Sequence, residues 1–297
     1  MASNSTHTRW RAGDVDRLLP RWVSRGVVLA CLAAVVLPVG YMLLLSVTPD
    51  AKVALGDVSL WGLRFGNYVT MWSQAPLAAG LFNTLAISGS ASLLSVVFGA
   101  LAAYPLARLR FRGQKTFLYS LIATQTVPGT TLLLPLFVVF SWLQTLSGIQ
   151  FIGNFNAIVI TYMTFGLPLS TWLMVTYLRT VPRELEEAAF VDGCTRIGAL
   201  FRIILPIAVP AMVVAFVFSF LVGWNDVLFA SVLTRSQTET LAVTMDQFAN
   251  NATGTGLPLY GQLMAAGVVS SIPVVVLYLV FQRRMVQGLS AGSVTAI

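Results

Sequence analysis

The chain has 297 residues, of which 57% are hydrophobic and only 10% are charged. A water-soluble domain has about 25% charged residues, so this composition excludes an ordinary soluble protein and indicates a protein that lies in a membrane. Eighteen Lys and Arg against eleven Asp and Glu give a net charge of +7. The basic residues lie in short segments between apolar runs, which favours the membrane surface over nucleic acid as their partner.

Six apolar runs are each long enough to cross a bilayer as a helix, which takes about 20 residues. In chain order the predicted spans are residues 27–47, 81–107, about 116–143, about 157–178, about 203–233 and 263–281. Residues 116–178 hold no charged residue and are too long a run for one crossing, so we divide this run into the third and fourth spans. The polar stretch 144–156 fits the turn between them. The sequence therefore predicts an all-α, polytopic membrane protein with six transmembrane helices.

The basic residues predict the orientation of the spans. Fifteen of the 18 Lys and Arg precede the first span or follow the second, fourth and sixth, whereas Lys52, Arg64 and Arg235 lie on the other side. The positive-inside rule then places both termini in the cytoplasm. We divide the chain into a cytoplasmic N-terminal tail of residues 1–26, a transmembrane domain of residues 27–281 and a cytoplasmic C-terminal tail of residues 282–297.

Residue counts exclude several kinds of chemistry. Cys31 and Cys194 are too few for a disulfide framework or a CxxC metal site. The single histidine, His7, leaves no scaffold for zinc hydrolysis, a Ser-His-Asp triad or haem ligation. Neither Lys52 nor Lys115 follows a glycine, so no P-loop for ATP is present in the sequence. We expect no catalytic residue, no metal and no cofactor on this chain.

Residues 179–205, between the fourth and fifth predicted spans, have the pattern of two short amphipathic helices. Pro182 suits a first helical turn, the glutamates after it favour the N-terminal end, and Gly193 fits the C-terminal cap. The expected apolar stripes are Leu185, Ala188 and Ala189 in the first helix, and Ile197, Leu200, Phe201 and Ile204 in the second. Such a hairpin fits a knob for a partner's groove, and equally a pair of helices lying on lipid headgroups.

The residues of this hairpin resemble a known motif. Glu187-Ala188-Ala189, then Gly193, then Ile203-x-Leu205-Pro206 match the EAA loop of permease subunits of binding-protein-dependent ABC importers. The similarity extends over residues 81–294. Asn83-Thr84-Leu85, Ala102-Ala103-Tyr104-x-Leu106-Ala107-Arg108 and Trp224-Asn225-Asp226 look like the carbohydrate branch of the family, and residues 287–294 are similar to the end of its maltose-importer permease.

The resemblance implies a type I ABC-importer permease fold in the bacterial cytoplasmic membrane. The implied partners are a second homologous permease, two ATPase subunits that carry ATP and Mg, an extracytoplasmic solute-binding protein or lipoprotein, and membrane lipid. This chain would be a non-catalytic subunit that imports a sugar, expected to be a di- or oligosaccharide. A polyol phosphate such as glycerol 3-phosphate is the alternative cargo. The C-terminal tail would reach between the ATPases or form a free end.

The resemblance assigns contact with the ATPase to one set of residues in the hairpin. This set is Glu187, Ala188, Ala189, Asp192, Gly193, Ile203, Leu205 and Pro206. Glu187 would make a polar or ionic contact, while Ala188 and Ala189 would keep the helix slim enough to enter a cleft. Asp192 fits either a cap for the second helix or a contact with the partner. The basic residues Arg183, Arg196 and Arg202 fit anionic lipid equally well.

A path for sugar requires hydrogen-bonding side chains and aromatic faces within the spans. The candidates are Asn83, Gln125, Tyr162, Trp172, Asn225 and Asp226. Asp226 is the default suspect because an acidic group in a span is costly, although it lies near the outer end of its span. For Tyr162 and Trp172, packing or interfacial anchoring is the more frequent role.

The outward segment 250–258 holds the candidate contacts to the binding protein. These are Asn250, Asn251, Thr253, Gly254 and Gly256. The segment occupies the place of a family loop that enters the sugar site of the binding protein, and its glycine-rich composition also fits a plain flexible connector.

The rival class of protein is a secondary transporter that works without an ATPase. Such a transporter needs an ion-coupling site and usually an internal repeat, and the sequence offers neither clustered acids within the spans nor a convincing repeat. A polytopic membrane enzyme is weaker still, because no acid–base set converges in the spans.

Overall fold

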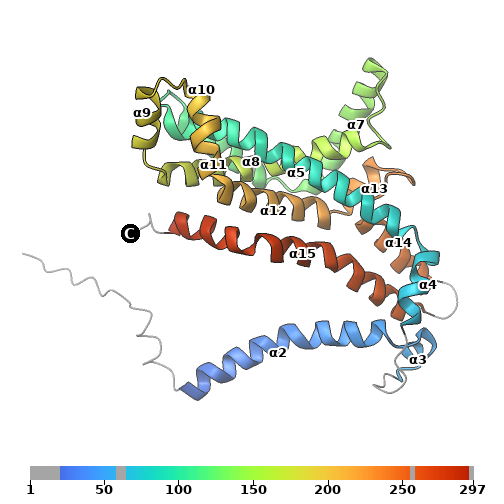
Figure 1. Ribbon diagram of the computed structural model, residues 1–297. Coiled ribbons are helices and arrows are strands. Elements are labelled where there is room, and N and C mark those ends of the chain that lie inside the picture. Colours follow the sequence, from blue (N-terminus) through green and yellow to red (C-terminus); the bar gives the residue numbers. More distant parts are fainter. Residues whose placement is uncertain (1–20, 58–64, 255–257, 294–297) are drawn as a thin grey trace, which may run out of the picture.

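A computed structural model describes residues 21–57, 65–254 and 258–293 of the chain. The regular elements of these residues are all helical (Figure 1). They are α2 (Arg21–Ser46), α3 (Asp50–Ala54), α4 (Gly66–Gln74), α5 (Leu77–Arg108), α6 (Gln114–Ala123), the 3-10 turn η1 (Thr124–Thr126), α7 (Gly129–Ser147), α8 (Phe155–Thr180), α9 (Glu184–Val191), α10 (Arg196–Ala199), the π-helical turn η2 (Leu200–Ile204), α11 (Leu205–Ile207), α12 (Val209–Asn225), α13 (Leu228–Leu233), α14 (Leu241–Gly254) and α15 (Tyr260–Ser293).

Five of these helices are long and apolar enough to cross a membrane: α2, α5, α7, α8 and α15. The bent pair formed by residues 196–207 and 209–225 brings the number of candidate spans to six. The all-α prediction with six spans is therefore confirmed. Figure 1 shows α2, α15, α12 and α5 lying side by side, with α9 and α10 at one end and α4 and α14 at the other. We call these the α9 end and the α14 end.

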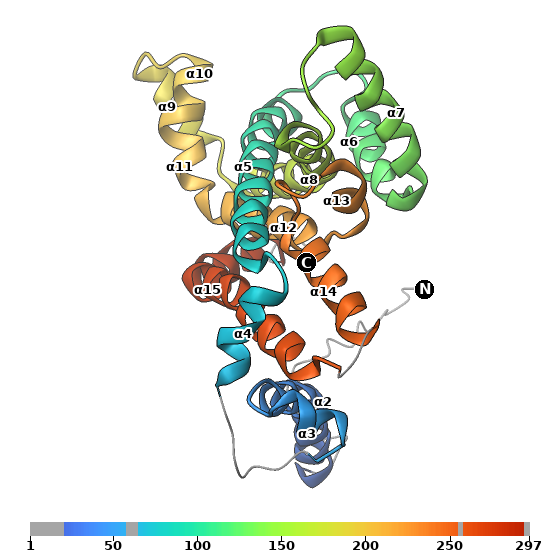
Figure 2. The ribbon, with the colours of Figure 1, turned by 90° about the vertical axis from the view of Figure 1, so that its right-hand side faces the viewer.

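The predicted third span, residues 116–143, is wrong as a continuous helix. The chain breaks between η1 and α7, where Val127 and Pro128 adopt extended backbone angles. Pro128 lacks an amide donor and forces the residue before it away from the helical region, so α6 and α7 are separate helices. Figure 2 shows α6 and α7 on one side of the α5–α8 pair and α9 to α11 on the other.

The predicted fifth span, residues 203–233, is also interrupted. The helix bends by 73° at Ala208, between α11 and α12. Pro206 and Pro210 flank the bend, and neither can donate the amide hydrogen that a continuous helix needs. At its other end α12 stops at Asn225, because Asp226 adopts an extended conformation before α13 begins.

The segment at residues 250–258, expected to be a loop, is helical in its first part, and a further short helix precedes α5. Residues 66–74 form α4, and the supposed loop at residues 250–258 begins as the last part of α14, which ends at Gly254. The helix continues because Phe248 and Ala252, four residues apart, are both buried against neighbouring helices. The first and last helices also extend beyond the predicted spans 27–47 and 263–281, since α2 begins at Arg21 and α15 continues to Ser293.

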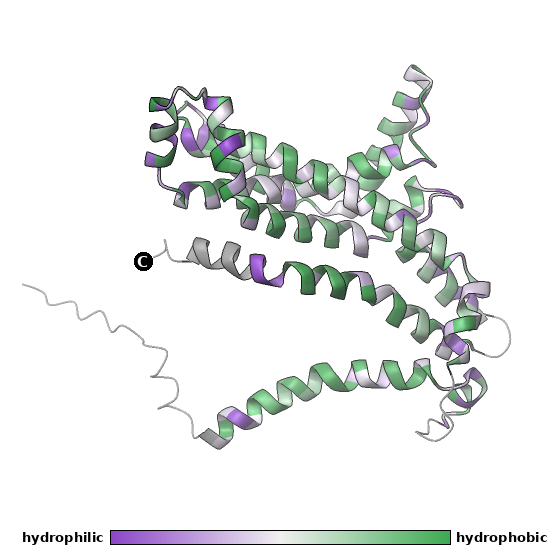
Figure 3. Cartoon of the chain, viewed as in Figure 1, coloured by the Kyte–Doolittle hydropathy of each residue, from purple (hydrophilic) through white to green (hydrophobic). Residues whose placement is uncertain are grey.

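The centre of the bundle is the mutual packing of α5, α8 and α12. Small residues allow the close approach: Gly99 faces Ser170 and Thr171, Gly166 lies between Ser95 and Ser219, and Gly223 lies against Ser88 and Tyr162. By contrast, α2 packs on α15 and its apolar window has no buried residue, as expected of a helix that faces lipid or a partner subunit. Hydrophobic residues cover the long helices, and hydrophilic ones gather on α9, α10 and the connections (Figure 3).

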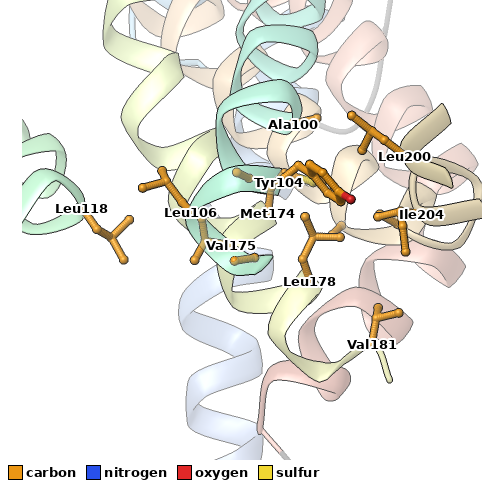
Figure 4. Packing of buried hydrophobic residues seen from close by; sticks show 14 residues of the cluster. Ala100, Tyr104, Leu106, Leu118, Met174, Val175, Leu178, Val181, Leu200 and Ile204 are labelled. Atoms are coloured by element: carbon orange, nitrogen blue, oxygen red, sulfur yellow. The ribbon is translucent and has the colours of Figure 1, made fainter. Parts of the chain in front are cut away.

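A buried cluster at the α9 end supports the segment between α8 and α12 (Figure 4). Tyr104 and Leu106 of α5, Met174 and Leu178 of α8, and Leu200 and Ile204 of η2 belong to it. Leu178 and Ile204 are fully buried. The hairpin predicted from residues 179–205 is therefore mounted on a rigid part of the bundle.

Replacing Gly99 by Ala is expected to destabilise the protein. A Cβ at this position would lie 2.9 Å from Ser170 Cβ and 3.1 Å from the backbone nitrogen of Thr171, and backbone cannot rotate away. We expect a loss of about 1–3 kcal/mol, measured by thermal unfolding of the detergent-solubilised protein. Gly89→Ala in the same helix is the matched control, because a Cβ there meets nothing within 4 Å. An equal loss in both variants would contradict close packing at Gly99.

Candidate functional site

The turn that follows α9 is built by Gly193 and Thr195. Gly193 has a φ of +83°, and the amide of Cys194 donates to the carbonyl of Ala189 at 2.9 Å, which is the arrangement of a glycine-terminated helix. The hydroxyl of Thr195 accepts the amide of Gly198 at 3.1 Å and so forms the N-cap of α10. The role of Gly193 is as predicted. The cap of the second helix is Thr195, which corrects the suggestion that the carboxylate of Asp192 caps it.

The exposure pattern of α9 differs from the predicted apolar stripe. The buried residues are Glu186 and Ala189, whereas Glu187 and Ala188 are exposed and Leu185 is 42% exposed. The helix thus rests on one narrow side and presents most of its surface outward. Ala188 and Ala189, predicted as a pair, have different environments.

The predicted face of the second helix is divided as well. Leu200 and Ile204 are buried, but Ile197 is 71% exposed and Phe201 is 56% exposed. The π-helical turn η2 has more residues per turn than an α-helix, which rotates the two pairs apart. Together with Val191, which is 87% exposed, Ile197 and Phe201 leave large apolar side chains uncovered at the most hydrophilic end of the molecule. Such a surface indicates a contact with another protein or with the membrane.

Ile203 and Leu205, also assigned to the hairpin, lie beneath this surface. They are half-buried, pack against the cluster at the α9 end and so support the hairpin. Pro206, in the first turn of α11, is exposed, as are Glu187, Ala188 and Asp192.

An ion pair that the sequence pattern did not reveal joins α5 to α9. Arg108 Nε donates to Glu186 Oε1 at 2.5 Å, and Arg108 Nη2 donates to the carbonyl of Val181 at 3.0 Å. The side chains of Arg108 and Glu186 are only 6% and 8% exposed. Three glutamates occupy the first turn of α9, and nothing in the sequence distinguishes Glu186 as the buried one.

A pocket of about 150 Å³ lies beside this ion pair. Its lining includes Tyr104, Arg108, Arg183, Glu187, Phe190 and Arg196. The pocket brings the predicted residue Glu187 next to basic side chains from α10 and from the residue before α9. Charged groups therefore surround the N-terminal turn of α9.

Two path candidates lie together on one side of α8. Gln125 and Trp172 line an apolar pocket of about 400 Å³ with Ile122, Pro168 and Leu169, and Gln125 also lines an adjoining pocket of about 380 Å³. The amide of Gln125 donates to the carbonyl of Phe165 at 2.8 Å, next to the turn that Pro168 disturbs. Trp172 is 40% exposed. The structure thus places a hydrogen-bonding group and an aromatic face on one concave surface.

Tyr162 and Asp226 form a different, buried arrangement. Tyr162 is 3% exposed, and its hydroxyl donates to Asp226 Oδ2 at 2.8 Å. The same oxygen accepts the amide of Ala230 at 3.0 Å, so Asp226 supports the start of α13 after the break in the span. Asn225 is exposed and donates to Leu221 in its own helix. The break in the chain thus accounts for the acidic group in this span.

Asn83, predicted as a residue of the sugar path, has a structural role that was not predicted. It is 6% exposed, and its side-chain amide donates to the carbonyls of Gln237 at 3.0 Å and Glu239 at 2.9 Å. The hydroxyl of its neighbour Thr84 accepts the amide of Leu241 at 2.6 Å. The Asn-Thr pair therefore fixes the connection into α14. Two adjacent polar residues inside an apolar span are the sequence feature that could have indicated this role.

The candidate contacts on α14 lie at the far end of the bundle from α9 (Figure 1). Asn250 and Asn251 are exposed, and Asn250 donates to Asp246 at 3.3 Å. Gly254 is the last residue of α14, directly after Thr253. Gly256 lies outside the described residues.

A six-span helical bundle with an exposed hairpin at one end and a concave, mainly apolar surface along its side defines an integral membrane protein. The family model for the binding-protein-dependent transport system inner membrane component matches residues 95–291. The chain belongs to this family, and it is a multi-pass membrane component of an ABC transport system.

Curated relatives match over most of their length. The chain is 31% identical to the sulfoquinovosyl glycerol transport system permease protein SmoH of Agrobacterium fabrum, over 86% of this chain and 87% of the relative. It is 32% identical to the trehalose transport system permease protein SugB of Mycobacterium tuberculosis, over 87% and 92%. It is 36% identical to the inner membrane ABC transporter permease protein YcjP of Escherichia coli, over 79% and 80%.

Solved structures share the fold. One chain of a bacterial ABC transporter that imports the acidic polysaccharide alginate superimposes with a TM-score of 0.71 at 21% identity, covering 93% of this chain and 99% of that one. A chain of the inward-facing MetNI methionine ABC transporter gives a TM-score of 0.53 at 17% identity, covering 72% and 95%. The predicted ABC-importer permease fold is confirmed.

Replacing Asn83 by Ala is expected to weaken the attachment of α14. The substitution leaves two carbonyls without their donor, for which we expect a loss of about 1–3 kcal/mol. Hydrogen exchange at the amide of Leu241 and the thermal unfolding midpoint measure the effect. Asn225→Ala, at an exposed residue that bonds only its own helix, is the control and should change stability by about 0.5 kcal/mol or less. Unchanged exchange at Leu241 would refute this role of Asn83.

Proposed function

We propose that the chain is the permease subunit of an ATP-driven importer of di- or oligosaccharides, and that it forms half of the translocation path. The observation that carries the proposal is the exposed side of α9, α10 and η2, where Ala188, Ile197 and Phe201 are exposed on a hairpin fixed to the bundle. A docking surface mounted rigidly on membrane helices suits a subunit that receives movement from a cytoplasmic ATPase.

The proposed orientation has the α9 end and both termini in the cytoplasm. The basic residues around the hairpin, among them Arg108, Arg183 and Arg196, gather at this end and agree with the positive-inside rule. ATP and Mg are bound by two ATPase subunits that dock on the hairpins of this chain and of a second homologous permease. The solute-binding protein then approaches the α14 end, where Asn250 and Asn251 are exposed.

The proposed substrate is a neutral sugar rather than a polyol phosphate. The residues that line the two pockets at Gln125 include no Asp, Glu, Lys or Arg, and a phosphate would call for basic partners. Trp172 offers an aromatic face and Gln125 a polar group, which suits a sugar ring. Relatives named for trehalose, diacetylchitobiose and maltose point the same way, whereas the relative named for sulfoquinovosyl glycerol is named for a sugar with an anionic sulfonate.

Docking of the ATPase is tested with single cysteines, in a background in which Cys31 and Cys194 are replaced. Ala188→Cys is expected to crosslink to the co-expressed ATPase, and the yield is expected to change when ATP is added. Ala189→Cys is the matched control on the same helix, because Ala189 is only 3% exposed and should react several-fold less. Equal yields at both positions would contradict the docking geometry, and no crosslink at Ala188 in a complex that transports would refute docking at α9.

The substrate class is tested by uptake into cells with radiolabelled maltose, trehalose, chitobiose and glycerol 3-phosphate. We expect uptake of at least one of the sugars, with an apparent KM raised about twofold to twelvefold in Trp172→Ala, since an aromatic contact contributes roughly 0.5–1.5 kcal/mol. Trp142→Ala is the control, because Trp142 is 61% exposed and lies outside both pockets. Uptake of glycerol 3-phosphate alone would support the alternative cargo, and uptake without any ATPase would indicate a secondary transporter.

A further inference from the structure

We propose that Arg108 is a positioning residue that joins α9 to α5, so that α5 carries the displacement of the docked hairpin to α14 at the opposite end of the bundle. The inference rests on the proposed docking of the ATPase at α9. Three described side chains, Arg108, Asn83 and Thr84, then form the link between the α9 end and the α14 end of the bundle.

The contacts of Arg108 reach both sides of the junction that leads into α9. Its guanidinium donates to Val181, the extended residue directly after α8, and to Glu186 in the first turn of α9. One side chain on α5 thus holds the connection and the helix at once. The planar fork of arginine suits this double contact, whereas the single ammonium of lysine cannot reproduce its geometry.

The backbone contacts of α9 do not supply an equivalent link. Its closest packing partners are α10 and η2, which lead to α12 through the bend at Ala208. Among the residues that the structure describes, Arg108 and Glu186 form the only ion pair. Both side chains are almost fully buried, so separating them would leave each charge without a partner and away from water. We therefore expect the ion pair to stay intact when the hairpin is displaced.

The helix between the two ends is suited to carry displacement. α5 has 32 residues, which corresponds to about 48 Å at 1.5 Å per residue. Pro105 removes one internal hydrogen bond near the α9 end, but Met174 and Leu178 of α8 pack beside Leu106 in the buried cluster at this point. The helix is therefore supported where its own bonding is weakest.

The attachment at the α14 end is equally specific. Asn83 and Thr84 hold the segment from Gln237 to Leu241 by three hydrogen bonds. Gly80 makes this approach possible, since a Cβ there would lie 2.8 Å from Thr244 Oγ1 and 3.1 Å from Leu241 Cα. α9, α5 and the start of α14 are thus joined as one body.

The test is a distance measurement by pulsed electron paramagnetic resonance on the complete importer complex. Spin labels are placed at Glu184→Cys on α9 and Asn251→Cys on α14, both exposed, with Cys31 and Cys194 replaced. For a rigid unit we expect one narrow distance distribution that is the same without nucleotide and with ATP trapped by a hydrolysis-blocked ATPase. In Arg108→Ala the distribution should broaden or shift when ATP binds. Arg110→Ala, an exposed arginine two residues away, is the control and should match the unsubstituted protein.

Restoration of the ion pair separates positioning from simple loss of stability. The exchange Arg108→Glu with Glu186→Arg should return a narrow distribution, whereas each single change should not. If Arg108→Ala fails to assemble, Arg108→Lys and the exchanged pair carry the test. A distribution in Arg108→Ala that stays narrow and independent of ATP, or an exchanged pair that behaves like its single variants, would overturn the inference.

The crosslink from Ala188→Cys to the ATPase distinguishes this inference from the proposed function. If the crosslink forms but the distances in Arg108→Ala do not depend on ATP, the role of Arg108 is refuted and the proposed function is not. Loss of the crosslink in the otherwise unsubstituted complex refutes docking at α9, and the inference falls with it.

Discussion

The structure depends on one constraint: polar groups inside a membrane bundle must find their partners within the protein, because lipid offers none. Each interruption of a span is accompanied by a side chain that bonds nearby. Asp226 accepts from Tyr162 and from the amide of Ala230 where α12 ends. Gln125 donates to Phe165 beside the turn disturbed by Pro168. These two polar side chains therefore first serve the backbone, and of the two only Gln125 is exposed enough to meet a substrate.

This constraint explains which parts of the site the sequence predicts. Composition and run length indicate six spans, because hydropathy along the chain decides what can enter a bilayer. The same signal does not show that Pro128 and Ala208 break two of these spans, since membrane helices also contain unbroken prolines, such as Pro38 in α2 and Pro135 in α7. Whether a proline ends a helix depends on tertiary packing around the freed carbonyls, which a single sequence does not report.

The hairpin at residues 179–205 shows the same division between pattern and packing. Its turn residue Gly193 is predictable, because a positive φ at a helix end strongly favours glycine. Which of its apolar residues are buried is not predictable from the pattern, because the π-helical turn η2 changes the helical period within the predicted apolar stripe. Among three adjacent glutamates, the choice of Glu186 as the buried one follows from the position of Arg108, which lies 78 residues earlier in the chain.

Within the hairpin, the exposed residues and the residue that anchors α9 to α5 are consequently different. Glu187, Ala188 and Asp192 lie on exposed positions that suit recognition of a partner. Glu186 is buried beside these exposed residues and bonds to α5. Asn83, itself part of a family motif, is buried and bonds to the connection before α14. A surface that binds a moving partner transmits the partner's displacement only if buried contacts fix that surface to the rest of the molecule. The short polar signatures inside the apolar spans are therefore best understood as the attachment points through which one end of the bundle acts on the other.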